Sequence, residues 1–273
     1  MNPLDQIPLA LVMVAATLIQ VAAIEIGFRI GAAPGGKPNK AQMAQVRAIM
    51  GASLGLLAFM LAFSFNSAQQ HYEERVRAYM LEISAIDSAF RGADLLDDAN
   101  RRLAQDMLVE FTDLRVQTLQ VVSRKEMPEM VEMIRESERL HDRLWSLAER
   151  AMEGAGEGED TGIFAQSILA MISAHDARLQ AVFFNRVSPI IWFTLASMAL
   201  LSMVVTGYQA GLTRTRSQLA TWTLAIAFAA VMTLITDLDR PRMSLFSMNQ
   251  GLMLEMSNRM KGGDSWDPEV HQR

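Results

Sequence analysis

The sequence predicts an all-α membrane protein with four transmembrane helices and long helices that extend into a helical extramembrane bundle. Four apolar stretches are each long enough, at about 17–25 residues, to cross a bilayer core as a helix. They lie at about residues 7–26, 48–65, 189–208 and 219–237. No sustained alternation of apolar and polar residues predicts a strand.

Most of the charge lies between the second and third apolar stretches. Residues 69–187 carry 22 acidic and 14 basic residues, whereas the rest of the chain carries 8 and 11. We expect this segment to be water-exposed, and its acidic balance argues against nucleic-acid binding, which requires a basic surface. The absence of cysteine excludes disulfides and thiolate metal sites.

The first membrane pair is assigned to residues 1–68. We expect its first helix to be retained and not cleaved as a signal, because no Lys or Arg precedes the apolar run. It should end near Gly27–Gly31, before a turn-rich loop at residues 32–40. The second helix is expected to run past the membrane, since apolar residues recur at helical spacing from Val76 to Phe90.

The extramembrane helical module is assigned to residues 69–187. Beyond the extension of the second helix, three more helices are predicted, at about residues 98–122, at about residues 128–152, and from Ile163 towards Pro189. The composition of residues 153–162 (EGAGEGEDTG) predicts a flexible acidic loop.

The second membrane pair is assigned to residues 188–240, and Pro241 is expected to end its last helix. Residues 241–273 form a tail that we expect to be partly ordered. Its apolar part, residues 243–256, is too short and too polar to span a membrane and should lie across a neighbouring surface. Disorder is expected from Lys261 onwards.

Four spans place both termini and the module on one side of the membrane. Six Lys and Arg residues lie close to the span ends on each side, so the positive-inside rule leaves the orientation open.

Several short motifs resemble one known family. They are Glu25-x-Gly27, the run from Gly55 to Phe65, Glu82-Ile-Ser-Ala-Ile86, Ala93-Asp-Leu-Leu96, Pro189, Gly207-Tyr-Gln-Ala-Gly211 and Asp237-Leu-Asp-Arg-Pro241. With these motifs, nearly the whole chain resembles the bacterial bestrophin-like domain, a family of unknown function with remote similarity to bestrophin anion channels. The resemblance implies a multi-pass protein of the bacterial inner membrane that assembles as a homo-oligomer, with a pentamer around one axial pore.

The same resemblance implies that the second membrane helix lines a narrow apolar neck. Phe59 and Phe63 have the expected four-residue spacing, with Gly55 one turn before them and Ser67 one turn after. Gly55 departs from the bulky residue expected at the first ring, which implies a shorter or wider neck. The spacing alone favours ordinary packing of both phenylalanines against lipid or another helix, and the resemblance makes the pore neck an equal alternative. Calcium gating is not implied, because only Asp237 and Asp239 stand where animal bestrophins carry a longer acidic run.

Two charged groups near span ends are further candidates. Glu25 and Arg29 are four residues apart and form a possible membrane charge pair, either on an ion path or as a local salt bridge with Arg29 reaching the interface. Asp237, Asp239 and Arg240 are expected to anchor a helix end or a subunit contact, in preference to binding a ligand.

No constellation of residues predicts an enzyme, a cofactor or a metal site. His71 with Glu74, and His175 with Asp176, are only fragments of a metal-binding pattern. We expect these residues to be solvated on the surface. The methionines, 20 in all, fall mostly on apolar stripes, where adaptable packing is the expected role.

The function predicted from the sequence is a homo-oligomeric channel, anion-selective and passive. Its partners would be the lipid bilayer, further copies of the chain and inorganic anions. The alternative is a non-conducting membrane sensor or scaffold, whose acidic helical module binds a partner. A membrane enzyme is the weakest hypothesis, because no convergent catalytic residues are apparent.

Overall fold

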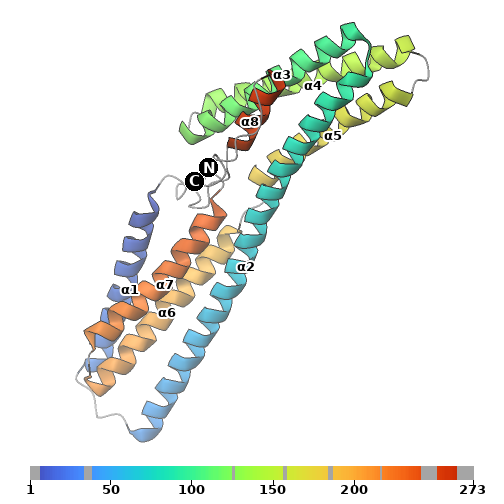
Figure 1. Ribbon diagram of the computed structural model, residues 1–273. Coiled ribbons are helices and arrows are strands. Elements are labelled where there is room, and N and C mark those ends of the chain that lie inside the picture. Colours follow the sequence, from blue (N-terminus) through green and yellow to red (C-terminus); the bar gives the residue numbers. More distant parts are fainter. Residues whose placement is uncertain are drawn as a thin grey trace. The chain divides into compact units, whose positions relative to one another are not determined.

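A computed structural model of the chain describes residues 7–33, 39–124, 127–155, 159–183, 187–215, 217–240 and 251–262. The described residues form eight α-helices and one short 3-10 helix, and none of them lies in a strand (Figure 1). The prediction of an all-α fold is therefore confirmed. The chain divides into two compact units, Met1–Tyr72 with Arg186–Pro241, and Glu73–Asn185 with Arg242–Arg273.

The first unit contains the four helices that are long and apolar enough to cross a membrane. They are α1 (Leu9–Ala32), the part of α2 (Lys40–Gly92) up to Tyr72, α6 (Pro189–Thr213) and α7 (Gln218–Asp239). Pro189 lies in the first turn of α6, where its missing N–H costs no hydrogen bond. Ser217 caps α7, because its Oγ accepts a hydrogen bond from the backbone N–H of Ala220 at 3.3 Å.

Helices α1 and α6 approach each other closely through glycines on both sides. A Cβ atom added at Gly27 would lie 2.0 Å from the carbonyl oxygen of Val204, and one added at Gly207 would lie 2.0 Å from that of Ile24. Gly31 and Gly211 repeat this contact one turn later. Helix α1 ends at Ala32, next to the Gly27–Gly31 segment where we expected its end, and the glycines within it serve helix packing.

Helix α2 packs into the first unit through one side only. Leu57, Leu61 and Ala68 on this side are buried with residues of α6 and α7, among them Leu195 and Ile235. Ser202 of α6 also donates a hydrogen bond to the carbonyl oxygen of Ser53, at 3.2 Å. The opposite side of α2 packs on no other helix in the described part of the unit and carries the exposed residues described below.

The second unit is a helical module with a core of large side chains. Its elements are α2 from Glu73, the 3-10 helix η2 (Ala93–Leu95), α3 (Asp98–Arg124), α4 (Met127–Ala155), α5 (Glu159–Phe183) and α8 (Gly251–Met260). Tyr79, Phe111, Leu144 and Ile168 are fully buried at its centre. The three predicted module helices match α3, α4 and α5, as apolar stripes at helical spacing indicated.

The acidic segment predicted as a loop is shorter than expected. Helix α4 continues to Ala155 and α5 already begins at Glu159, so only residues 156–158 lie outside both helices and outside the described residues. Glu and Ala are strong helix formers, and they outweigh Gly154 within α4 and Gly162 within α5.

The apolar part of the tail includes a helix that packs on its own module. Met253 and Met256 of α8 are buried in the core of the second unit. Ser257 and Lys261 each donate a hydrogen bond to Oδ1 of Asp113 in α3, both at 2.6 Å. The surface on which this helix lies is thus α3 of the same chain. The remaining tail residues, 241–250 and 263–273, lie outside the described residues.

Candidate functional site

The exposed side of α2 carries the two phenylalanines predicted for a pore neck. Phe59 and Phe63 are 65% and 62% exposed, although both lie in an apolar membrane-spanning stretch. They share one face because residues four apart on a helix lie one above the other. Leu57 and Leu61 are buried on a different face of the same helix. Among the described residues of the first unit, no other helix covers either phenyl ring.

The neighbours of the two phenylalanines along this face change from small to polar. Gly51 and Gly55 precede them, and a Cβ atom at either glycine would meet no atom within 4 Å. Asn66 and Gln70 follow them and are exposed, whereas Ser67 is only half-buried and lies at the edge of the face. A helix face of this kind brings a small-residue section, two aromatic rings and two amides into one line.

The charge pair predicted near the end of the first span is formed in α1. Nε of Arg29 donates a hydrogen bond to Oε1 of Glu25 at 2.9 Å. The Arg29 side chain is 78% exposed, as expected for a long cation that reaches towards the membrane interface. Glu25 is less exposed and lines a pocket between helices.

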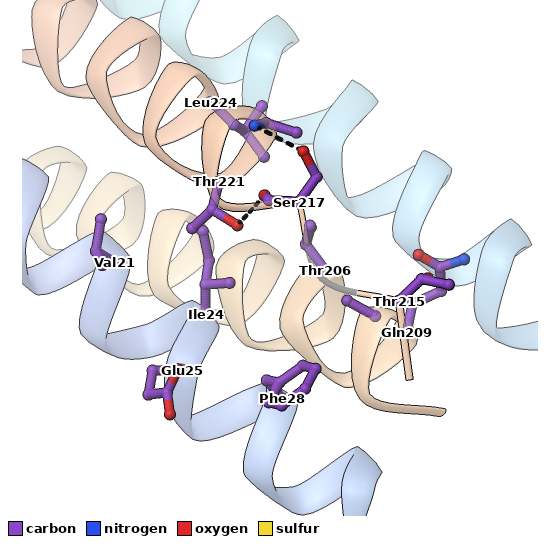
Figure 2. A pocket seen from close by; sticks show the side chains of 12 residues that line it. Val21, Ile24, Glu25, Phe28, Thr206, Gln209, Thr215, Ser217, Thr221 and Leu224 are labelled. Carbon is purple, nitrogen blue, oxygen red and sulfur yellow. Dashed lines mark hydrogen bonds between the residues drawn. The ribbon is translucent and has the colours of Figure 1, made fainter. Parts of the chain in front are cut away.

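That pocket lies between α1, α6 and the start of α7 (Figure 2). It has a volume of about 230 Å³. Glu25 and Phe28 enter it from α1, Thr206 and Gln209 from α6, and Thr221 from α7. Both polar and apolar side chains line this cavity in the first unit, and no sequence motif predicted it.

The charged residues at the end of α7 contact the segments that precede α6 and α1. Oδ1 of Asp239 accepts a hydrogen bond from the backbone N–H of Val187, which precedes α6, at 2.8 Å. Nη1 of Arg240 donates to the carbonyl oxygen of Ile7, which precedes α1, also at 2.8 Å. Asp237 is buried beside them. The three residues thus lie where the ends of three membrane helices are held together.

A cluster of buried charged and aromatic residues occupies the core of the second unit. Oε1 of Glu82 lies 3.1 Å from Nε of Arg115 and 3.0 Å from Nδ1 of His175, and Nη1 of Arg178 donates to Oε2. Because a carboxylate can only accept, Nδ1 of His175 carries the proton in this contact. The guanidinium carbon of Arg178 lies 5.0 Å from the centre of the Tyr79 ring.

A second histidine completes this cluster from α4. The ring centres of His141 and His175 are 4.8 Å apart, and Phe111 lies 5.0 Å from His141. Neither His141 Nε2 nor His175 Nε2 has a hydrogen-bond partner among the described residues.

Burial and neighbouring charges together set the pKa values of Glu82, Arg115 and His141. Burial alone raises the pKa of Glu82, but Arg115, Arg178 and His175 together outweigh it and lower this pKa to about 2. Burial lowers the pKa of Arg115 to about 10, despite the opposing effect of Glu82. Burial, followed by His175 and Arg115, lowers the pKa of His141 to about 4. Glu82 is thus ionised and His141 neutral near pH 7.

The prediction that His175 is a solvated surface residue was wrong, because its side chain is only 1% exposed. The sequence did contain an indication of the cluster. Glu82 stands in the apolar stripe between Tyr79 and Ile86, and Arg115 continues the stripe of Phe111 at helical spacing. No group of three or more His, Asp or Glu residues within the described parts of the chain is arranged to hold a metal ion.

Comparison with known families shows to which protein family the chain belongs. A sequence model of the Bestrophin-like domain matches residues 16–241, which include most of α1, the whole of α2, α6 and α7, and the module helices α3 to α5. The chain belongs to the bestrophin-like domain family. No curated protein and no solved structure matches the chain. The match and the four long apolar helices together make this a membrane protein of a family related to anion channels.

The matched region contains the three features described above. These are the exposed aromatic face of α2, the pocket beside Glu25 and the buried cluster around Glu82. Helix α8, at Gly251–Met260, lies beyond it.

Proposed function

We propose that the protein forms a homo-oligomeric, anion-selective pore whose neck is lined by Phe59 and Phe63 of each subunit. The observation that carries this proposal is the pair of exposed rings on the unpartnered face of α2. One copy of α2 cannot enclose a pore, so several copies must surround a common axis. Five subunits, as the family resemblance implies, would place five such faces around it.

The chemistry of this face suits a narrow, weakly anion-selective constriction. Rings of apolar side chains restrict flow by excluding water from the narrowest section. Phenyl edges carry partial positive charge, which an anion can approach more favourably than a cation can. The exposed amides of Asn66 and Gln70 follow the rings along the helix and offer donors to an ion that regains its hydration there.

The proposal is tested by measuring chloride flux through the purified full-length protein in lipid bilayers. Phe59→Ala should raise the conductance several-fold, because it removes the bulk that narrows the neck. Phe193→Ala is the matched control, since Phe193 of α6 is a similarly exposed phenylalanine, 72% exposed, on another helix. It should leave the conductance unchanged if the Phe193 ring faces lipid.

Two results would reject the pore. One is a lack of anion flux in both the wild-type protein and the Phe59→Ala variant, and the other is an equal response to both alanine substitutions. The mass of the protein in mild detergent provides an independent check. A monomer or a dimer cannot form an axial pore and would favour the alternative of a membrane sensor or scaffold.

A further inference from the structure

Two threonines in the pocket between α1, α6 and α7 present hydrogen-bond acceptors. Oγ1 of Thr206 donates its proton to the carbonyl oxygen of Ser202 at 2.8 Å, and Oγ1 of Thr221 donates to that of Ser217 at 3.1 Å. With their protons used within the helices, these hydroxyls present only lone pairs to a ligand. The second of these hydrogen bonds is drawn in Figure 2.

Among the described residues that line this pocket, only Glu25 is charged, and as a carboxylate it adds further acceptor capacity. Its partner Arg29 is mostly exposed and does not line the pocket. An acceptor-rich cavity with one negative charge favours a cationic hydrogen-bond donor as its ligand.

The apolar part of the lining favours an organic cation over a bare metal ion. Val21, Ile24, Phe28 and Leu224 contribute hydrocarbon surface to the walls. Such walls suit the methylene groups next to an ammonium, and an aromatic ring such as Phe28 can contact the cation itself. A metal ion would instead require several converging oxygen ligands.

The start of α7 lies at the same pocket, and the amino-terminal end of a helix attracts negative charge. Glu25 opposes a ligand that is only anionic. A zwitterion satisfies both ends, with its ammonium at Glu25 and its phosphate near Ser217.

We propose that this pocket binds a primary ammonium group, carried by a phosphatidylethanolamine headgroup or by a small free amine. Glu25 binds the ammonium, and the lone pairs of Thr206 and Thr221 accept its remaining protons. A volume of about 230 Å³ holds an ethanolamine-sized group. This assignment is independent of whether the protein conducts ions.

The test is thermal unfolding of the full-length protein in detergent with added short-chain lipids of equal chain length. Phosphatidylethanolamine should raise the melting temperature, whereas phosphatidylcholine and phosphatidylglycerol should not. The choline headgroup lacks N–H donors, and the glycerol headgroup lacks the cation. A parallel titration with ethanolamine, against tetramethylammonium at equal ionic strength, separates a free amine from a lipid as the source. Stabilisation by ethanolamine shows that the amine suffices, and stabilisation by the lipid alone assigns the headgroup.

Variants separate ligand binding from the local salt bridge. Glu25→Gln should weaken phosphatidylethanolamine binding by about tenfold or more, because it removes the charge that binds the ammonium. Arg29→Gln breaks the same salt bridge but retains the carboxylate, so binding should persist. Thr206→Val keeps the shape of the wall, removes one acceptor and should cause a smaller loss.

Three outcomes would overturn the assignment. They are the absence of stabilisation by both the lipid and the amine, equal stabilisation by all three lipids, and equal binding by the wild-type and Glu25→Gln proteins.

Discussion

The interiors of the two units are built differently. In the first unit, α1 and α6 are so close at Gly27 and Gly207 that backbone lies against backbone. In the second unit, the core consists of large side chains such as Phe111, and it also buries Glu82 with two arginines. The contact between α1 and α6 thus requires the absence of side chains, whereas the core of the second unit requires large and charged ones.

This difference follows from the solvent that surrounds each unit. In a bilayer, apolar side chains gain little by leaving the lipid, so helices associate through close contact of small residues. In water, the burial of apolar surface drives packing. Its favourable free energy can offset the desolvation cost of a buried polar cluster. We therefore expect the two units to respond to different kinds of substitution.

The largest loss of stability is expected when a single methyl group is added to the membrane unit at Gly207. Gly207→Ala places a methyl group 2.0 Å from the carbonyl oxygen of Ile24, and backbone on both sides prevents local relief. Helices α1 and α6 must separate, so we expect a loss of more than about 4 kcal/mol or no folded protein. Gly51→Ala is the control, because its added methyl meets no atom within 4 Å. Thermal unfolding in detergent, with the yield of monodisperse protein, measures both.

Similar melting temperatures for these two variants would show that the close crossing does not hold the unit together. The contrast is sharp because both substitutions add one methyl group within an apolar membrane helix. Only the distance to the neighbouring backbone differs.

The next largest effect is expected in the module. Glu82→Gln preserves shape but leaves Arg115 and Arg178 buried without their shared carboxylate, which should cost about 3–5 kcal/mol. Glu110→Gln is the control, since Glu110 pairs with Arg143 at 3.4 Å on the surface, where both are about half exposed. Such pairs contribute about 0–1 kcal/mol. Denaturant unfolding compares the two, and equal losses would contradict a special role of burial.

Much of the architecture could be predicted from the sequence, because the length of each apolar stretch and the spacing of apolar residues indicate the helices. Four apolar stretches gave the membrane helices, and the stripes at three- and four-residue spacing gave α3 to α5. The role of Gly27 could not be predicted in this way. A glycine is compatible with the end of a helix and with a close crossing, and only the position of α6 distinguishes the two.

The candidate sites were predictable to a different degree. The spacing of Phe59 and Phe63 indicates a shared face, but their exposure depends on which side of α2 packs on α6 and α7. The cluster around Glu82 combines residues from four helices, so no local pattern could assemble it. A histidine such as His175 is compatible with both surface and core, and its partner is 93 residues away in the chain.

The smallest of the predicted effects on stability is its dependence on pH, which we expect in the module. The pKa of His141 is lowered to about 4 in the folded protein, against about 6.5 in an unfolded chain. Between these values the unfolded state binds more protons, so stability must fall as the pH falls from 6.5 to 4. The full shift corresponds to about 3 kcal/mol, most of which should be lost near pH 4.

The groups that face His141 explain why the folded module resists this proton. Burial disfavours a charged His141 most, the nearby His175 and Arg115 add to this effect, and His141 Nε2 has no acceptor among the described residues. His141→Leu should remove the loss between pH 6.5 and 4, whereas His71→Gln retains the cluster and should preserve it. The loss from protonation of Glu82 belongs to a lower window, from about pH 4.5 to about 2, because its pKa is lowered to about 2. Unfolding measured at pH 7 and pH 4.5 thus isolates the histidine, and an unchanged slope in the His141→Leu variant would place the titrating group elsewhere.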